Sequence, residues 1–159
     1  MGLLKDRFKV KAEASSAEIK DLLKQHGSKK IGEVQLSQIY QGMRGITGLV
    51  SETSLLDAKE GIRFRGYSIP ELQQQLPKIP GGTEPLPEGL FYLMLIGELP
   101  NEEDVAYITS SWQRRSHVPN HVFAAIDALP VTAHPMTMFV TGIMALQTES
   151  NFAVATLRV

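Results

Sequence analysis

The segment LPEGLFYLMLIGELP, residues 86–100, decides the fold class of this chain. Nearly every position from Pro87 to Ile96 is apolar, and Gly97 and Pro100 supply the stop signals that end a helix. A helix that is apolar all round is expected to be buried. The apolar run is about half as long as a helix that crosses a bilayer. The segment therefore predicts a core helix in a mainly α protein.

Helical patterns continue downstream of this segment. Asn101 is a candidate N-cap, because three acidic residues follow it in the first turn, where the helix dipole favours negative charge. A second pattern runs from Val122 to Leu129, and a last helix is predicted after Pro135. The predicted apolar faces consist of Val105, Ile108 and Trp112 in the first of these helices, and of Met136, Val140, Ile143 and Met144 in the last.

Two capping boxes predict helix starts upstream of the segment. Ser15 and Glu18 precede an apolar stripe, and Gly27 is placed where a helix ends in a left-handed turn. Ser68 and Glu71 form the second box, with a proline in the first turn. One amphipathic helix is thus expected between Ser15 and Gly27, and a short one after Ser68.

A less regular region lies between these two helices. Ser37 is predicted to cap a short helical turn, and the glycines of GMRGITG, residues 42–48, then favour a loop. Residues 49–69 predict a small antiparallel β-hairpin, because Ile62 and Phe64 alternate with arginines at the strand period of two. The predicted fold is therefore mainly α with one small hairpin.

Composition and charge limit the classes of partner. The 159 residues, 43% of them apolar, suit one domain with a real core. Sixteen basic and seventeen acidic side chains give a net charge of −1, which disfavours nucleic acid and anionic membranes as partners. The absence of cysteine excludes disulfides and thiolate metal sites. No metal site is predicted, because the histidines lack a ligand spacing; they are His26, His117, His121 and His134.

Few residues are candidates for chemistry. Arg44 lies in the glycine-rich GMRGITG, where backbone N–H groups and a fixed charge suit a phosphate, but the spacing matches no known phosphate loop and favours a structural turn. His134 is better explained as a capping or core histidine than as a catalytic base. Arg63 and Arg65 are better explained as an ion-paired or solvated face than as a ligand clamp. Three acids surround the hairpin turn but lack the apolar setting that would raise a carboxylate pKa for general-acid catalysis; they are Glu52, Asp57 and Glu60.

Three longer motifs change this interpretation. They are GMRGITGLVSETSLLDAKEGIRFRGYSIPE, LPKIPGGTEPLPEGLFYLMLIGELP and LPVTAHPMTMFVTGIMALQTESNF. In this order they resemble the mitochondrial-type citrate synthases of eukaryotes, and EGIRFRG and EPLPEGLF are the most specific parts. The resemblance covers residues 1–152, which look like the N-terminal part of the large domain in that family. Residues 153–159 are predicted to be a divergent tail.

The resemblance implies a helical, homodimeric enzyme that condenses acetyl-CoA with oxaloacetate to give citrate and CoA. It implies no permanently bound cofactor, since acetyl-CoA is a substrate, and it implies a place in the mitochondrial matrix, although no transit peptide is visible. The helix over residues 135–152 resembles one that the family buries between its two subunits. Arg44 occupies the position of an arginine that helps neutralise the phosphates of CoA.

The family keeps its catalytic histidines and aspartate in a later segment, so the resemblance assigns no catalytic residue to this sequence. We therefore expect the chain to be inactive alone. Two interpretations stay open: an incomplete product of a citrate synthase gene, and a non-enzymatic truncated isoform that pairs with full-length subunits.

Overall fold

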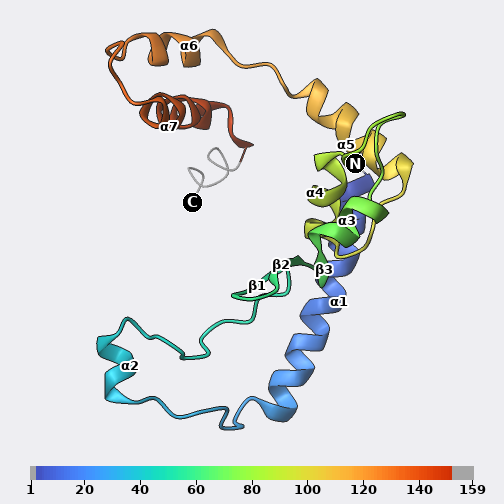
Figure 1. Ribbon diagram of the computed structural model, residues 1–159, viewed down its shortest axis with the longest axis vertical. Helices are drawn as coiled ribbons and strands as arrows, with labels where there is room; N and C mark the ends of the chain where they lie inside the picture. Colours follow the sequence, from blue (N-terminus) through green and yellow to red (C-terminus); the bar gives the residue numbers. More distant parts are fainter. Residues whose placement is uncertain (1–2, 152–159) are drawn as a thin grey trace. The chain divides into compact units, whose positions relative to one another are not determined.

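The computed structural model describes residues 3–151. These divide into two compact units, and the boundary between the units falls between Thr109 and Ser110 in the sequence. The predicted mainly α fold with one small antiparallel sheet is confirmed (Figure 1). The first unit contains α1 (Leu3–His26), α2 (Leu36–Tyr40), β1 (Ser54–Asp57), β2 (Gly61–Phe64), β3 (Tyr67–Ser68), α3 (Ile69–Gln75), α4 (Pro87–Ile96) and the start of α5 (Glu102–Arg114). The second contains the end of α5, then α6 (Asn120–Asp127), α7 (Pro135–Leu146) and the 3-10 turn η1 (Gln147–Glu149).

The core of the first unit forms on two sides of α4. On one side Leu93 packs with Leu72 and Leu76, which α3 and its C-cap contribute. On the other side Tyr92 and Ile96 pack with Ile108 of α5. The predicted bounds of α4 are confirmed, and Gly97 ends the helix in a left-handed conformation with φ 85°.

The predicted burial of α4 on all sides is wrong. Phe91 is 40% exposed, and other apolar side chains of the helix are only half-buried. Helices α1, α3 and α5 pack against α4 but leave part of its surface uncovered, so an all-apolar sequence does not ensure burial on every side in this unit.

The small sheet contains one strand more than the predicted hairpin. β1 and β2 pair antiparallel, with Ser54 opposite Phe64, and β3 adds a second antiparallel pairing to β2. Asp57 shapes the first turn, because its Oδ1 accepts the N–H groups of Glu60 and Lys59 at 2.9 and 2.7 Å. These two hydrogen bonds hold the pKa of Asp57 below its ordinary value.

The first helix is longer than the capping box at Ser15 predicts. α1 begins at Leu3, so Ser15 lies inside the helix and the predicted start is wrong. Good helix formers such as lysine, alanine and leucine dominate the preceding residues, and contacts with α4 fix them in place. The predicted end is right, but Gly27 is not left-handed. A Cβ at Gly27 would lie 2.4 Å from the Leu23 carbonyl oxygen, so close approach explains this glycine.

The cap of α2 is also different from the prediction. Gln35, two residues before Ser37, is the N-cap and exchanges side-chain and backbone hydrogen bonds with Gln38. Glutamine is an uncommon N-cap, so a sequence rule based on serine missed it.

The second unit is built on a hairpin of α6 and α7. Val122 and Ile126 pack against Gly142, where an added Cβ would lie 3.0 Å from the Ile126 side chain. His121 Nε2 lies 3.2 Å from the Ala145 carbonyl and links the start of α6 to the end of α7. The helix predicted over residues 135–152 is shorter than expected, because α7 ends at Leu146 and η1 follows.

Two further predictions concern the C-terminal tail and the length of the apolar helices. The divergent tail predicted at residues 153–159 lies outside the described residues. Among the helices of the described part, none combines the length and apolar character that a membrane span requires.

Candidate functional site

Arg44 lies in a tight turn that follows α2 directly. Gly42, Met43 and Gly45 all have left-handed backbones, with φ of 71°, 63° and 73°. The predicted glycine turn at this place is confirmed. The Arg44 side chain is exposed, and within residues 3–151 it has no ion pair and no hydrogen bond.

The turn is held by hydrogen bonds within its own segment. Met43 N–H donates to the Gln38 carbonyl at 2.8 Å, and Ile46 N–H donates to the Met43 carbonyl at 3.2 Å. Gln38 Nε2 donates to the Arg44 carbonyl at 3.4 Å. The guanidinium is thus presented to solvent on a backbone that is fixed locally.

His121 and His134 have imidazole rings that form hydrogen bonds, and both rings have structural roles. His134 is the N-cap of α7, and its Nδ1 accepts the Met136 N–H at 3.1 Å, as the capping interpretation predicts. His121 lies beside Ala145 and Thr148. In the part of the chain that the structure describes, no group of histidine and acidic residues is arranged to hold a metal ion.

The arginines of the small sheet have structural partners. Arg63 forms ion pairs with Glu60 at 3.4 Å and Glu71 at 3.7 Å, which agrees with the predicted ion-paired surface. Arg65 is less exposed than predicted: its side chain is 21% exposed, and Nη2 donates to the Met94 carbonyl at 2.9 Å. Because Met94 lies near the C-terminus of α4, Arg65 satisfies a carbonyl at the negative end of that helix.

A polar network that the sequence did not predict ties α1 to α4 and α5. Arg7 forms a 2.6 Å ion pair with Asp104, which is 4% exposed, and also donates to the Tyr92 hydroxyl. Hydrogen bonds to Tyr92 and Asp104 raise the pKa of Arg7. Asp104 N–H donates in turn to the Asn101 side chain at 2.9 Å, which confirms Asn101 as the N-cap of α5. This network is a structural element of the fold.

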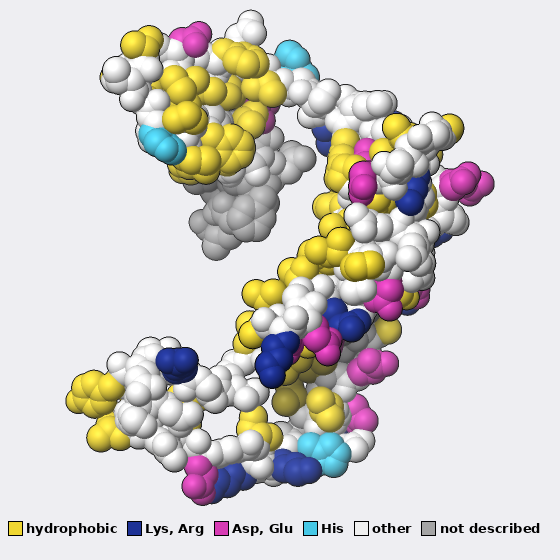
Figure 2. All heavy atoms as spheres, viewed as in Figure 1, with side chains coloured by type: hydrophobic (Ala, Val, Ile, Leu, Met, Phe, Trp, Pro, Cys, Tyr) yellow, Lys and Arg dark blue, Asp and Glu magenta, His cyan; other side chains and the backbone are white. Residues whose placement is uncertain are grey.

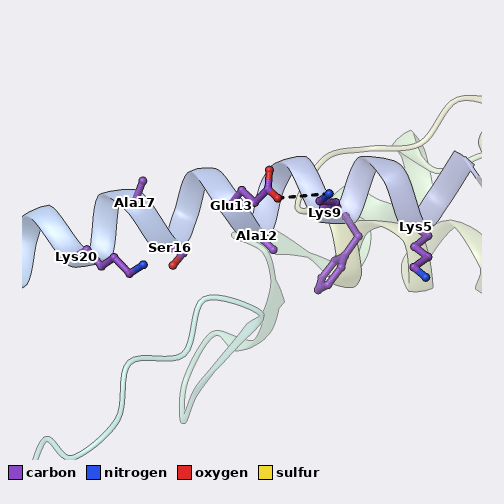
Figure 3. Close-up of a pocket in the computed structure, with 8 residues that line it drawn as sticks. Lys5, Lys9, Ala12, Glu13, Ser16, Ala17 and Lys20 are labelled. Atoms are coloured by element: carbon purple, nitrogen blue, oxygen red, sulfur yellow. Dashed lines mark ion pairs between the residues drawn. The ribbon is translucent and has the colours of Figure 1, made fainter. Parts of the chain in front are cut away.

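One hollow on the first unit has a volume of about 560 Å³, but all eight residues that line it belong to α1, so it does not enclose an active site (Figure 3). Figure 3 shows Lys5, Lys9 and Lys20 along this single helix, with Glu13 paired to Lys9. A smaller polar cleft of about 380 Å³ lies between α1, Glu52, Arg65 and the end of α4. Arg65 is already occupied by its contacts there.

Comparison with known proteins identifies the family. A family model described as citrate synthase, C-terminal domain, matches residues 42–157. The chain is 52% identical over 135 residues to a protein of the swordfish Xiphias gladius named mitochondrial citrate synthase, covering 85% of this chain. The chain belongs to the citrate synthase family. It is also 52% identical over 152 residues, or 96% of its length, to the mitochondrial citrate synthase of Aspergillus niger.

The citrate synthase match covers much more of this chain than of its relatives. The aligned region spans 29% of the Xiphias protein and 32% of the Aspergillus protein. The chain thus corresponds to about a third of a citrate synthase. The match includes the Arg44 turn, since the family model begins at residue 42.

Proposed function

We propose that this chain is the N-terminal portion of an enzyme that condenses acetyl-CoA with oxaloacetate to give citrate and CoA. The observation that carries the proposal is the 52% identity over 152 residues to a citrate synthase. Both relatives are named mitochondrial, so we also infer the mitochondrial matrix as the location. In this function the chain handles small-molecule substrates and holds no permanently bound cofactor.

We infer that Arg44 contributes to binding a phosphate group of CoA. The support is an exposed guanidinium that has no partner within residues 3–151, on a turn whose backbone is fixed by its own hydrogen bonds. Guanidinium groups bind phosphate through planar, bidentate hydrogen bonds. This contact would attach one end of the substrate and takes no part in the carbon–carbon bond formation.

We further propose that residues 3–151 contain no complete catalytic site. His121 and His134 are engaged in contacts that shape the α6–α7 hairpin, and no described acid lies in hydrogen-bond contact with either ring. A thioester methyl group is a weak carbon acid, so its deprotonation needs a positioned base and a stabilised enolate. We expect no release of CoA from acetyl-CoA and oxaloacetate by the purified chain.

A chimera tests this function directly. The aligned 152 residues of the Aspergillus enzyme would be replaced by those of this chain, and CoA release would be measured for the chimera and for the chain alone. We expect activity only in the chimera. Arg44→Ala should raise KM for acetyl-CoA by about ten- to 150-fold while kcat changes little, since a charged hydrogen bond contributes roughly 1.5 to 3 kcal/mol. A folded but inactive chimera, or turnover by the repurified chain alone, would contradict the proposal.

A second candidate is a non-enzymatic partner of full-length citrate synthase subunits. It is favoured by the exposed apolar face of α7, on which Phe139 is 60% and Met144 is 65% exposed. Size-exclusion chromatography of a mixture with the full-length enzyme would discriminate the two. A mixed dimer with reduced activity per subunit supports this candidate, whereas separate elution removes it.

A further inference from the structure

Gln38 makes three contacts around the turn that carries Arg44. Its backbone carbonyl accepts the Met43 N–H at 2.8 Å, and its side-chain Nε2 donates to the Arg44 carbonyl at 3.4 Å. Its side-chain Oε1 accepts the Gln35 N–H at 2.9 Å, at the start of α2. Gln38 is half-buried, whereas the residue on each side of it is exposed. The Gln38 side chain thus connects the start of α2 to the turn.

The turn requires such contacts because its backbone conformation is unfavourable. Met43 has a φ of 63°, and Gly42 before it is also left-handed. Glycine adopts this region readily, but a residue with a Cβ rarely does. A strained residue of this kind persists only where surrounding contacts hold it. For Met43 the hydrogen bond from its own N–H to Gln38 is such a contact.

The same contacts leave donors of the turn available for a ligand. In the described part of the chain, the N–H groups of Arg44 and Gly45 have no hydrogen-bond partner, and the Arg44 guanidinium has none either. Backbone N–H groups of a tight turn and a guanidinium are donors that suit a phosphate. All hydrogen bonds found for residues 35–46 stay within that segment, so no hydrogen bond to another described element holds it.

We propose that Gln38 is a positioning residue that presents Arg44 to a phosphate group of CoA. The inference rests on the proposed CoA contact of Arg44 and names the residue through which the contact is oriented. Gln38 does not touch the ligand. Its backbone carbonyl holds the Met43 N–H, as any residue at this position could, and its side-chain amide holds the Arg44 carbonyl. The side-chain contact is the one that fixes the direction in which the Arg44 side chain leaves the backbone.

The first experiment compares two neutral substitutions in the complete 159-residue chain. Gln38→Met removes both side-chain hydrogen bonds, and Gln41→Met is the matched control, because Gln41 is exposed and its side chain makes no hydrogen bond in the described part. CoA is titrated into each protein by calorimetry at low ionic strength. We expect Gln38→Met to raise Kd about fivefold, the loss of roughly one hydrogen bond, and Gln41→Met to leave it unchanged.

A double substitution separates positioning from a general loss of structure. In the Arg44→Ala background, Gln38→Met should have no further effect on Kd, because Gln38 acts through Arg44. A structural role independent of Arg44 would weaken CoA binding again. The coupling between the amide and Hα protons of Arg44, whose carbonyl the Gln38 side chain holds, reports the backbone conformation of the turn without ligand, and we expect it to change in Gln38→Met only.

The outcomes distinguish the two proposals. If the wild-type chain does not bind CoA, or if Arg44→Ala leaves Kd unchanged, the proposed role of Arg44 is wrong. If Arg44→Ala weakens binding but Gln38→Met does not, the Arg44 contact stands and the positioning role of Gln38 is overturned. An unchanged Arg44 coupling in Gln38→Met overturns the positioning role independently of any ligand.

Discussion

Glu88 lies in the first turn of α4 with 8% of its surface exposed. Its Oε1 accepts a hydrogen bond from Thr109 at 3.0 Å, whereas its buried Oε2 has no partner among the described residues. The positive end of the helix dipole offsets part of the unfavourable burial of a carboxylate. A buried oxygen without a partner still costs about 1 to 3 kcal/mol.

The free energy of unfolding should therefore respond to Glu88→Gln. The amide keeps an oxygen for Thr109 and replaces Oε2 by an NH2 group that also lacks a partner, but it removes the buried charge, which costs more than a buried neutral amide. We therefore expect a gain of about 1 kcal/mol. Urea denaturation followed by circular dichroism measures this change. Glu13→Gln is the control, because Glu13 is 67% exposed and its ion pair with Lys9 spans 3.8 Å; it should change stability by less than about 0.5 kcal/mol. A loss of stability in Glu88→Gln would show that the carboxylate is needed.

Single residues also show which side-chain contacts could be predicted from the sequence and which could not. The role of His134 as a cap was predicted, because its position before a proline at a helix start is local. The partners of Arg7 and Glu88 could not be predicted, since Asp104 is 97 residues from Arg7 and Thr109 is 21 residues from Glu88. Such pairings depend on how helices pack, which a spacing pattern does not specify.

At the scale of elements, the short helix α3 is determined by its cap. Ser68 Oγ accepts the Glu71 N–H at 3.4 Å, and the Glu71 carboxylate accepts both the Ser68 hydroxyl at 2.6 Å and the Ser68 N–H at 2.7 Å. Together with the nearby Arg63, these hydrogen bonds from Ser68 hold the pKa of Glu71 below its ordinary value. A helix of seven residues is too short to be stable without such contacts.

Ser68→Ala should destabilise the first unit by about 1 kcal/mol at pH 7, the usual contribution of an N-cap side chain. The effect should depend on pH. A depressed folded-state pKa means that Glu71 stabilises the fold above its unfolded pKa and that this contribution is lost as the pH falls through the folded pKa. Denaturation midpoints of wild type and Ser68→Ala, measured from pH 7 down to pH 3, should therefore converge in acid. A difference that stays constant over this range would contradict the contribution of Glu71.

Local signals explain which elements the sequence predicted. The bounds of α4 and the caps of α3 and α5 follow from glycine, proline and capping residues within a few positions. The start of α1 and the strand β3 were missed because they depend on other elements: α1 contacts α4, and the two residues of β3 pair with β2. The Arg44 turn was predicted from its glycines, but the left-handed Met43 and the contacts of Gln38 have no signal in residue spacing.

At the scale of the whole molecule, much apolar surface is exposed in each unit. Figure 2 shows apolar side chains gathered over the α6–α7 unit. The outer face of α7 has exposed fractions of 58% at Met136, 53% at Val140 and 43% at Ile143. No residue of α7 is charged, so nothing on this helix would oppose contact with another apolar surface. Contiguous exposed patches of this kind normally mark an interface or an aggregation site.

We therefore expect the isolated chain to self-associate through the outer face of α7. Burial of a large apolar side chain contributes roughly 1.5 to 3 kcal/mol, so a few such residues suffice to hold two chains together. The double substitution Ile143→Asp with Met144→Lys should shift the chain toward monomer, measured by light scattering coupled to size-exclusion chromatography. The control is Thr137→Asp with Gln147→Lys, which introduces the same charges at exposed polar positions of the same region. A wild-type chain that is monomeric and unfolds cooperatively, or a control that dissociates equally, would show that this face does not drive association.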